Sequence, residues 1–255
     1  MKRLTAILAA LIASAAITAI PARAAIGSVT TVCGTRSLQV HVPELTYLNV
    51  YNAPATQNTT CVRARPGHAS FEILSTRKHG DWGYPNISSG WERGEYSCLD
   101  ASGACYRYPV RESADGMPET SLGVDMHGDG NASYDIWFNR TDAHPVQDDG
   151  TEIMIWLKHP GVAEYGSVPV TIEGIRFRIM HWTSEHDGIT WYYAAYIMVR
   201  QRSSVNNLWL NGFFRDAIAR GWLRSSWYLT GIDAGFELTG GGAGSVATMQ
   251  LHGVR

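Results

Sequence analysis

Short runs of alternating apolar and polar residues recur along this chain, and glycine, asparagine, aspartate or proline separates them. Successive side chains of an extended strand point to opposite faces of a sheet, so this alternation predicts strands. The predicted strands are Leu38–Val42, Ala69–Leu74, Ser133–Phe138, Glu152–Leu157, Ile175–Trp182, Thr190–Arg200, Gly235–Leu238 and Val246–Leu251. Their regular turn spacing is typical of an all-β protein, a sandwich or β-jelly roll of two antiparallel sheets.

The predicted strand Glu152–Leu157 has two very different faces. Glu152, Met154 and Trp156 share one face, whereas the apolar residues Ile153, Ile155 and Leu157 share the other. Burying a carboxylate without a partner is strongly unfavourable, so this mixed face indicates an open groove in a concave surface. We expect Met154 to line that groove and Trp156 to stack against a ligand. The alternative is a solvated glutamate on a half-exposed sheet.

The predicted strand around Glu237 repeats this arrangement. Glu237 shares its face with Gly235 and Thr239, and the residues between them, Phe236 and Leu238, form an apolar face. Two carboxyl groups, one protonated and one ionised, are the minimum equipment for hydrolysing a glycosidic bond without a metal. The two strands together therefore predict general acid and base chemistry.

One segment departs from the strand pattern. From Val205 to Arg220, apolar residues recur at the i, i+4 spacing of a helix face, as in Trp209, Phe213 and Ala217. Basic residues followed by Gly221 are typical of a helix C-terminus. We expect a single helix packed on the sandwich, with its aromatic residues in the core.

The first residues have the features of an export signal. Lys2 and Arg3 precede an apolar run from Leu4 to Ile20, and a small-x-small pattern ends at Ala24. We predict a secretory signal peptide over residues 1–24 and one catalytic domain over residues 25–255. A membrane anchor is the alternative, but the run is short. The mature protein is expected to be secreted and extracellular, without membrane contact.

The charge of the mature chain argues against one class of partner. Removing the three basic residues of the signal leaves 18 Lys and Arg against 23 Asp and Glu, a formal charge of −5. There is also no basic run interleaved with aromatic residues, so nucleic acid is not an expected partner.

The four cysteines predict two disulfides in an exported protein. Spacing favours Cys33 with Cys61, and Cys98 with Cys105, because the second pair closes a short loop rich in turn-forming residues. Other pairings stay open. A zinc site is the less favoured alternative, since no C-x-x-C occurs.

Two histidine or aspartate clusters lack the spacing of metal sites. The segment Asp125–Gly130 begins like a calcium loop, but Ile136 stands at the twelfth position where a bidentate glutamate is needed, so we interpret it as a turn. The segment His181–His186 is not the H-E-x-x-H pattern of zinc hydrolases. No metal and no cofactor are expected.

Over essentially the whole mature region, the chain resembles glycoside hydrolase family 12, the small endoglucanases with a β-jelly-roll fold. The residues that carry the resemblance are Glu152–Leu157 (EIMIWL), Gly235–Glu237, Ser133–Trp137 (SYDIW), Tyr84–Asn86 and the cysteine placement. The resemblance implies that Glu152 is the nucleophile, that Glu237 is the acid/base and that Asp135 supports the nucleophile by a hydrogen bond. It also implies retention of anomeric configuration.

The resemblance further implies a stacking residue near the N-terminus of the mature chain. The family motif Asn-x-Trp-Asn corresponds here to the segment Asn49–Asn52, in which Tyr51 replaces the tryptophan and leaves a smaller platform. We therefore take Asn49 and Tyr51 as candidate substrate-binding residues, with Trp82, Trp91 and Trp137 as further aromatic candidates that are more typical of packed residues.

The combined hypothesis is a secreted endo-β-1,4-glucan hydrolase acting on cellulose or mixed-linkage β-glucan, with the polysaccharide as its partner and a monomer as its expected state. A xyloglucan-specific enzyme of the same family is one alternative. The other is a carbohydrate-binding sandwich domain without chemistry.

Overall fold

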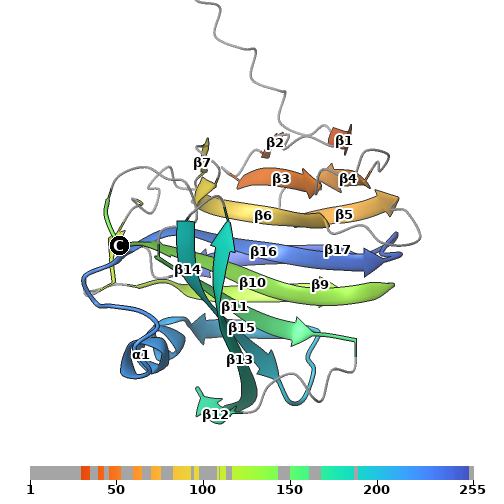
Figure 1. The fold of residues 1–255 in the computed structure, drawn as a ribbon. Coiled ribbons are helices and arrows are strands. Elements are labelled where there is room, and N and C mark those ends of the chain that lie inside the picture. The colour runs from red at the N-terminus through yellow and green to blue at the C-terminus, as the bar shows by residue number, and fades with distance from the viewer. Residues whose placement is uncertain are drawn as a thin grey trace, which may run out of the picture.

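Two β-sheets face each other in the computed structural model, and a single helix lies at one end of them in the part of the chain that is described (Figure 1). The described residues are 30–34, 40–42, 46–52, 60–64, 70–75, 83–92, 95–97, 108, 110–112, 117–142, 150–160, 168–186 and 189–252. The predicted signal peptide, Cys98, Cys105 and Trp82 lie outside them. The predicted all-β sandwich is confirmed.

The smaller sheet has six strands. In spatial order they are β1 (Thr30–Gly34), β4 (Thr60–Ala64), β5 (Ser70–Ser75), β17 (Val246–His252), β9 (Glu119–Asp125) and β15 (Ser204–Trp209). The predicted turn at Asp125–Gly130 is confirmed, because it joins β9 to the first strand residue of β10.

The larger sheet has eleven strands. Its main path runs β12 (Val168–Ile172), β13 (Ile175–His186), β14 (Ile189–Met198), β11 (Gly150–Lys158), β10 (Asp129–Asn139), β16 (Tyr228–Gly240), β6 (Gly83–Glu92), β3 (Thr46–Asn52) and β2 (Val40–Val42). Two short strands, β7 (Glu95–Ser97) and β8 (Val110–Arg111), pair with β6 and β16. The pairing is antiparallel throughout except between β11 and β14.

The main core fills the space between the sheets. On β11 the residues Ile153, Ile155 and Leu157 are fully buried in it. Met154 belongs to a second, smaller cluster, and Trp156 packs against that cluster. Since neighbouring residues of a strand face opposite ways, the second cluster lies on the outer face of the larger sheet. This is the face on which the sequence predicts a concave groove, and it is called the concave face below. The predicted separation of faces on this strand is therefore confirmed.

The predicted helix over Val205–Arg220 is wrong in its first part. Ser204–Trp209 forms β15, and helix α1 covers only Asn211–Ala219. Asn207 has a left-handed φ of 49°, which a right-handed helix does not contain, and the pairing with β9 shifts at this point. The strand buries Val205 and Leu208 in the core, which explains why apolar spacing alone misplaced the boundary.

Helix α1 ends as predicted, at Gly221 with a left-handed φ of 79°. Its buried residues Phe213, Phe214 and Ala217 join the core, so the expectation for its aromatic residues is confirmed.

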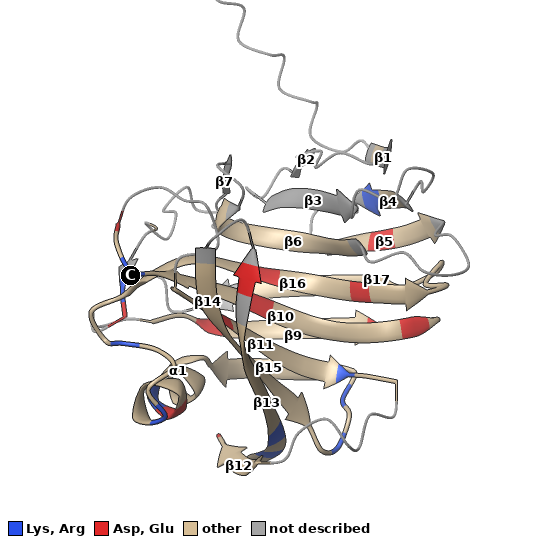
Figure 2. Cartoon of the chain, in the orientation of Figure 1, with Lys and Arg blue, Asp and Glu red and all other residues tan. Residues whose placement is uncertain are grey.

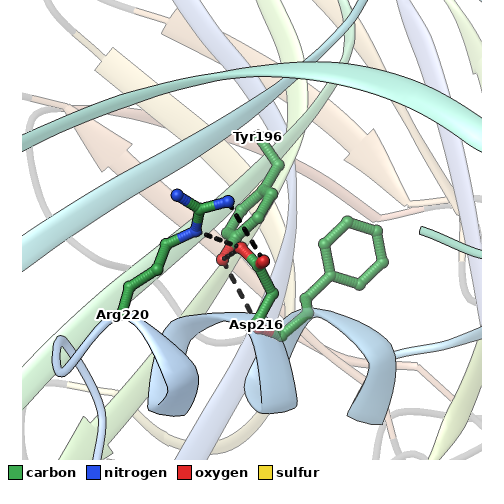
Figure 3. A network of polar contacts seen from close by, with 4 residues as sticks. Tyr196, Asp216 and Arg220 are labelled. Carbon is green, nitrogen blue, oxygen red and sulfur yellow. Dashed lines mark hydrogen bonds and ion pairs between the residues drawn. The ribbon is translucent and has the colours of Figure 1, made fainter. Parts of the chain in front are cut away.

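A polar network fastens this helix to the large sheet (Figure 3). The hydroxyl of Tyr196 on β14 donates to Asp216 over 3.0 Å, and the guanidinium of Arg220 donates to both carboxylate oxygens of Asp216 over 2.7 and 3.2 Å. A paired carboxylate of this kind holds the tyrosine-bearing strand in place from behind the concave face.

No helix among the described residues has the length and apolar character that crossing a bilayer requires.

Cys33 and Cys61 are direct register partners on β1 and β4.

Candidate active site

Strand β11 places Glu152 on the concave face, where it is only 9% exposed. The indole nitrogen of Trp191 on β14 donates a hydrogen bond of 2.9 Å to a carboxylate oxygen of Glu152. A charge-assisted bond of this kind stabilises the carboxylate and fixes its orientation. Because Glu152 and Met154 are nearly buried, the floor of the concave face is less open than the sequence predicts.

Met154 forms the centre of the apolar part of this floor. Its sulfur accepts contacts from the hydroxyl of Tyr193 at 3.0 Å and from the indole nitrogen of Trp156 at 3.4 Å. Ala195 and Ile197 complete the buried part of the cluster. Trp156 keeps a partly exposed ring beside Met154, as expected for a platform on this face.

Glu237 reaches the same face from β16. Its register partner on β10 is Asn131, whose side-chain amide donates a bond of 2.5 Å to the Glu237 carboxyl group. The Asn131 amide oxygen accepts a bond of 2.8 Å from the hydroxyl of Ser133, which holds that amide in its orientation. Burial raises the pKa of Glu237, and the hydrogen bond from Asn131 lowers it by a smaller amount. Glu237 therefore keeps its proton to a higher pH than an ordinary glutamate.

Strand β10 lies between the two strands that carry these glutamates. Asp135 on β10 is the register partner of Met154 on β11 and of Asp233 on β16. The partner of Glu152 on β10 is Trp137, two residues along from Asp135. Asp135 is thus diagonal to Glu152, at a separation that side chains on one sheet face can bridge.

The electrostatic surroundings of two tyrosines, Tyr193, which is buried, and Tyr84, which is partly exposed, indicate that the carboxyl groups form one cluster. Burial raises the pKa of Tyr193, and the negative charges of Glu152, Glu237 and Asp135 raise it further. These three predicted catalytic residues are therefore close enough to act on one phenol.

Tyr84 lies on β6, on the β16 side of the carboxyl cluster, and a partly different set of negative charges affects its pKa. Its hydroxyl donates to the backbone carbonyl of Ser133 over 3.1 Å. Burial raises the pKa of Tyr84, and the negative charges of Asp135, Asp233 and Glu237 raise it further.

The charged residues of the large sheet are unevenly distributed. Acidic segments lie on the neighbouring strands β10 and β16, whereas Lys and Arg gather near β12 and the adjoining end of β13 (Figure 2).

The predicted binding residues of β3 are placed by their backbone register. Asn49 pairs with Asn86, and Tyr51 pairs with Tyr84 on β6, the strand next to β16. Their side chains lie outside the described part of the structure. Of the further aromatic candidates, Trp137 is 8% exposed and its ring lies 6.4 Å from that of Trp191, whereas Trp91 packs against the core.

The sequence model described as Glycosyl hydrolase family 12 matches residues 45–251. The chain belongs to glycosyl hydrolase family 12. The resemblance inferred from the EIMIWL and neighbouring motifs is therefore confirmed.

Relatives and solved structures agree with this assignment. Endoglucanase S of Pectobacterium parmentieri is 25% identical over 170 residues, which are 64% of this chain and 62% of that protein. Endoglucanase cel12A from Rhodothermus marinus has a TM-score of 0.73 at 26% identity, covering 88% of this chain and 99% of that one. The native family 12 xyloglucanase from Bacillus licheniformis has a TM-score of 0.72 at 21% identity, covering 89% and 100%, and supports the fold.

Within this family 12 fold, sequence reasoning missed four residues that lie beside the predicted catalytic groups through contacts between strands: Trp191, Tyr193, Asn131 and Asp233. It named Tyr84 only as part of a motif, without its position beside the carboxyl groups. Trp191 and Tyr193 alternate within the predicted strand Thr190–Arg200, so that pattern could have marked them as one face. Asp233 and Asn131 gain their significance only from register with Asp135 and Glu237.

Among the described residues, no three or more His, Cys, Asp or Glu side chains are grouped so that they could hold a metal ion. The groups that the concave face does assemble are carboxyl, phenol, indole and amide side chains. This set can donate and accept protons, present a carboxylate nucleophile and stack against an apolar ring face.

Proposed function

We propose that this family 12 protein is a secreted endo-β-1,4-glucan hydrolase that retains anomeric configuration, with Glu152 as nucleophile and Glu237 as acid/base. The observation that carries the proposal is the unequal surroundings of two glutamates on one concave face. Glu152 accepts a hydrogen bond from an indole, whereas burial raises the pKa of Glu237. Environments that favour a carboxylate at one group and a proton at the other divide the roles of nucleophile and acid.

In the first step Glu237 gives its proton to the glycosidic oxygen, and the Glu152 carboxylate attacks the anomeric carbon. The bond to the leaving sugar breaks as an ester to Glu152 forms. The Trp191 indole holds the attacking carboxylate group, and Asp135 supports it from the neighbouring strand. The low exposure of the floor keeps competing water away from the nucleophile.

In the second step the ionised Glu237 takes a proton from water, and the hydroxide equivalent attacks the same anomeric carbon. The ester to Glu152 breaks, which restores the free carboxylate and leaves Glu237 protonated. Two inversions at one carbon give net retention. Asn131 serves in both steps, since its amide donates to the Glu237 carboxyl and can hold it ready for either transfer.

The proposed substrate is the interior of a β-1,4-linked glucan, either cellulose or mixed-linkage β-glucan. The support is the naming of several similar proteins as endoglucanases and the partly exposed Trp156 on the concave floor. A xyloglucan preference is the second candidate, because one solved structure of the same fold is a xyloglucanase. Asn49 and Tyr51 are proposed to bind the same polysaccharide from β3.

Export and disulfide bonding belong to the same proposal. The sequence of residues 1–24 supports secretion, and an oxidising compartment would allow the two disulfides. The proposed state of the enzyme is a monomer. The direct register of Cys33 and Cys61 supports that pairing. It places the two residues at a separation compatible with a disulfide.

The test is to compare wild type with Glu152→Gln and Glu237→Gln on carboxymethylcellulose, barley β-glucan and tamarind xyloglucan. Each substitution keeps the size of the side chain and removes the acid, so kcat should fall by about a thousandfold or more. Release of reducing ends measures turnover, and circular dichroism with thermal unfolding checks folding.

Wild-type activity on the linear glucans and loss of turnover in both folded variants would support the proposal. Near-normal rates in either variant would contradict the assigned role. Binding by wild type without release of sugar would favour a carbohydrate-binding domain, and activity confined to xyloglucan would favour the second candidate.

A further inference from the structure

Trp182 on β13 is the only tryptophan among the exposed large apolar side chains of the described residues, with 41% of its surface accessible. Its indole packs flat on the phenol ring of Tyr193, with ring centroids 3.8 Å apart and planes inclined by 22°. Stacking covers one face of the indole and leaves a large part of the side chain in contact with solvent.

The Trp182 side chain lies on the concave face. Its register partner is Tyr193, whose hydroxyl contacts the sulfur of Met154 on that face. Met180, two residues earlier on the same strand, packs against the same apolar cluster. The exposed indole is therefore continuous with the floor that carries the catalytic glutamates.

Register places Trp182 at a defined distance from the proposed nucleophile. Glu152 on β11 pairs with Tyr193 on β14, and Tyr193 pairs with Trp182 on β13. Neighbouring strands are about 4.8 Å apart, so Trp182 lies about 10 Å to one side of the Glu152 backbone. A polysaccharide that passes Glu152 can reach it within a short run of sugar units.

The backbone of β3, which carries the predicted binding residue Tyr51, lies on one side of the carboxyl cluster, and Trp182 on β13 lies on the other. A polymer cut in its interior must extend on both sides of the cleavage point. A binding residue on the β13 side supplies contacts that the β3 residues cannot.

We propose that Trp182, held in orientation by Tyr193, is a stacking platform for the part of the glucan that lies on the β13 side of the cleavage point. The proposal rests on the proposed function and adds the residue that binds the second arm of the substrate. Because the Tyr193 stack fixes the indole before binding, the ring loses little conformational freedom when a sugar packs on it.

The first experiment compares wild type, Trp182→Ala and Trp182→Phe on barley β-glucan and on cello-oligosaccharides of increasing length. Removing a contact made equally in the ground and transition states raises KM without lowering kcat. We expect KM of Trp182→Ala on the polymer to rise about tenfold, with kcat within about twofold of wild type. Trp182→Phe should recover most of the affinity, and the KM difference should shrink for the shortest oligosaccharides.

The matched control is His181→Ala. His181 is the neighbouring residue on β13, points to the opposite face and stacks on Trp222 with centroids 4.1 Å apart. It therefore removes a stacked ring from the same strand without touching the concave face. Its KM should equal that of wild type.

A binding measurement separates this inference from the proposed function. In the Glu152→Gln background, affinity electrophoresis through gels containing barley β-glucan should show retardation that Trp182→Ala removes and His181→Ala keeps. Equal retardation with and without Trp182 would overturn the inference, as would an unchanged polymer KM or a fall in kcat alone. Failure of wild type to hydrolyse any glucan would instead overturn the proposed function. The gel retardation would still show whether Trp182 binds the glucan, because that assay does not depend on turnover.

Discussion

Strand β11 has two faces with opposite surroundings. Toward the smaller sheet, Ile153, Ile155 and Leu157 have no exposed surface and belong to the main core. Toward the concave side, Glu152 accepts a hydrogen bond from an indole and Met154 contacts a phenol hydroxyl. The backbone is shared, so the difference arises from the side chains that β11 itself and the neighbouring strands place on each face.

This contrast assigns different consequences to the two faces. Burial of apolar side chains in the core stabilises the fold in proportion to the area removed from water. Holding several carboxyl groups close together on the concave face opposes folding, because like charges and desolvation are both unfavourable. Changes on the core face should therefore alter stability, and changes on the concave face should alter chemistry.

The largest of the effects that test this contrast is expected for Ile155→Ala. The side chain is fully buried, so its truncation should cost about 2–5 kcal/mol of unfolding free energy through lost burial and the cavity left behind. Urea unfolding measures this loss, and kcat of the protein that remains folded should stay near that of wild type. A large fall in kcat with unchanged stability would contradict the claim that the core face of β11 determines stability rather than chemistry.

A smaller effect is expected for Trp191→Phe on the concave face. Phenylalanine keeps an aromatic ring but removes the donor to Glu152, and hydrogen bonds to charged groups contribute about 1.5–3 kcal/mol. We expect kcat to fall roughly 10- to 100-fold with little change in unfolding free energy. Trp209→Phe, on β15 of the other sheet, is the control and should keep full turnover. Equal losses in both variants would count against a specific role for Trp191.

The smallest effect is a shift in the pH profile of Asn131→Ala. The hydrogen bond from Asn131 lowers the pKa of Glu237, so its removal should raise that pKa further. Activity requires protonated Glu237 and falls as pH rises through its pKa, so the basic limb of the kcat/KM profile should move to higher pH by about one unit or less. A basic limb that moves to lower pH would show that another group controls it.

The strands that the sequence predicted are those with a clear apolar alternation, such as β11 and β14. Strand β6 was missed because its residues 85–90 are all buried although most are polar or glycine. Their burial comes from neighbouring strands on both sides, which a local pattern does not contain. The start of helix α1 was misplaced for a related reason, since pairing with β9 holds Ser204–Trp209 as a strand.

The residues of the candidate site likewise fall into those that the local sequence pattern reveals and those that only strand pairing reveals. Glu152 and Glu237 stand out in the sequence because each is a charged residue within an apolar strand. Asp233 does not, because the predicted strand began at Gly235 and the actual strand begins at Tyr228. Its position opposite Asp135 depends on the register between two strands that are distant in the chain, and that register is set by the packing of the whole sheet.

The most direct test of the central claim is the anomeric configuration of the first product, followed by proton NMR during hydrolysis of a soluble β-glucan or cello-oligosaccharide by wild type. Attack by Glu152 followed by attack of water gives two inversions, so the β-anomer should appear first and then mutarotate. If the α-anomer appears first, Glu152 is not a nucleophile and the proposed division of roles between the two glutamates is wrong.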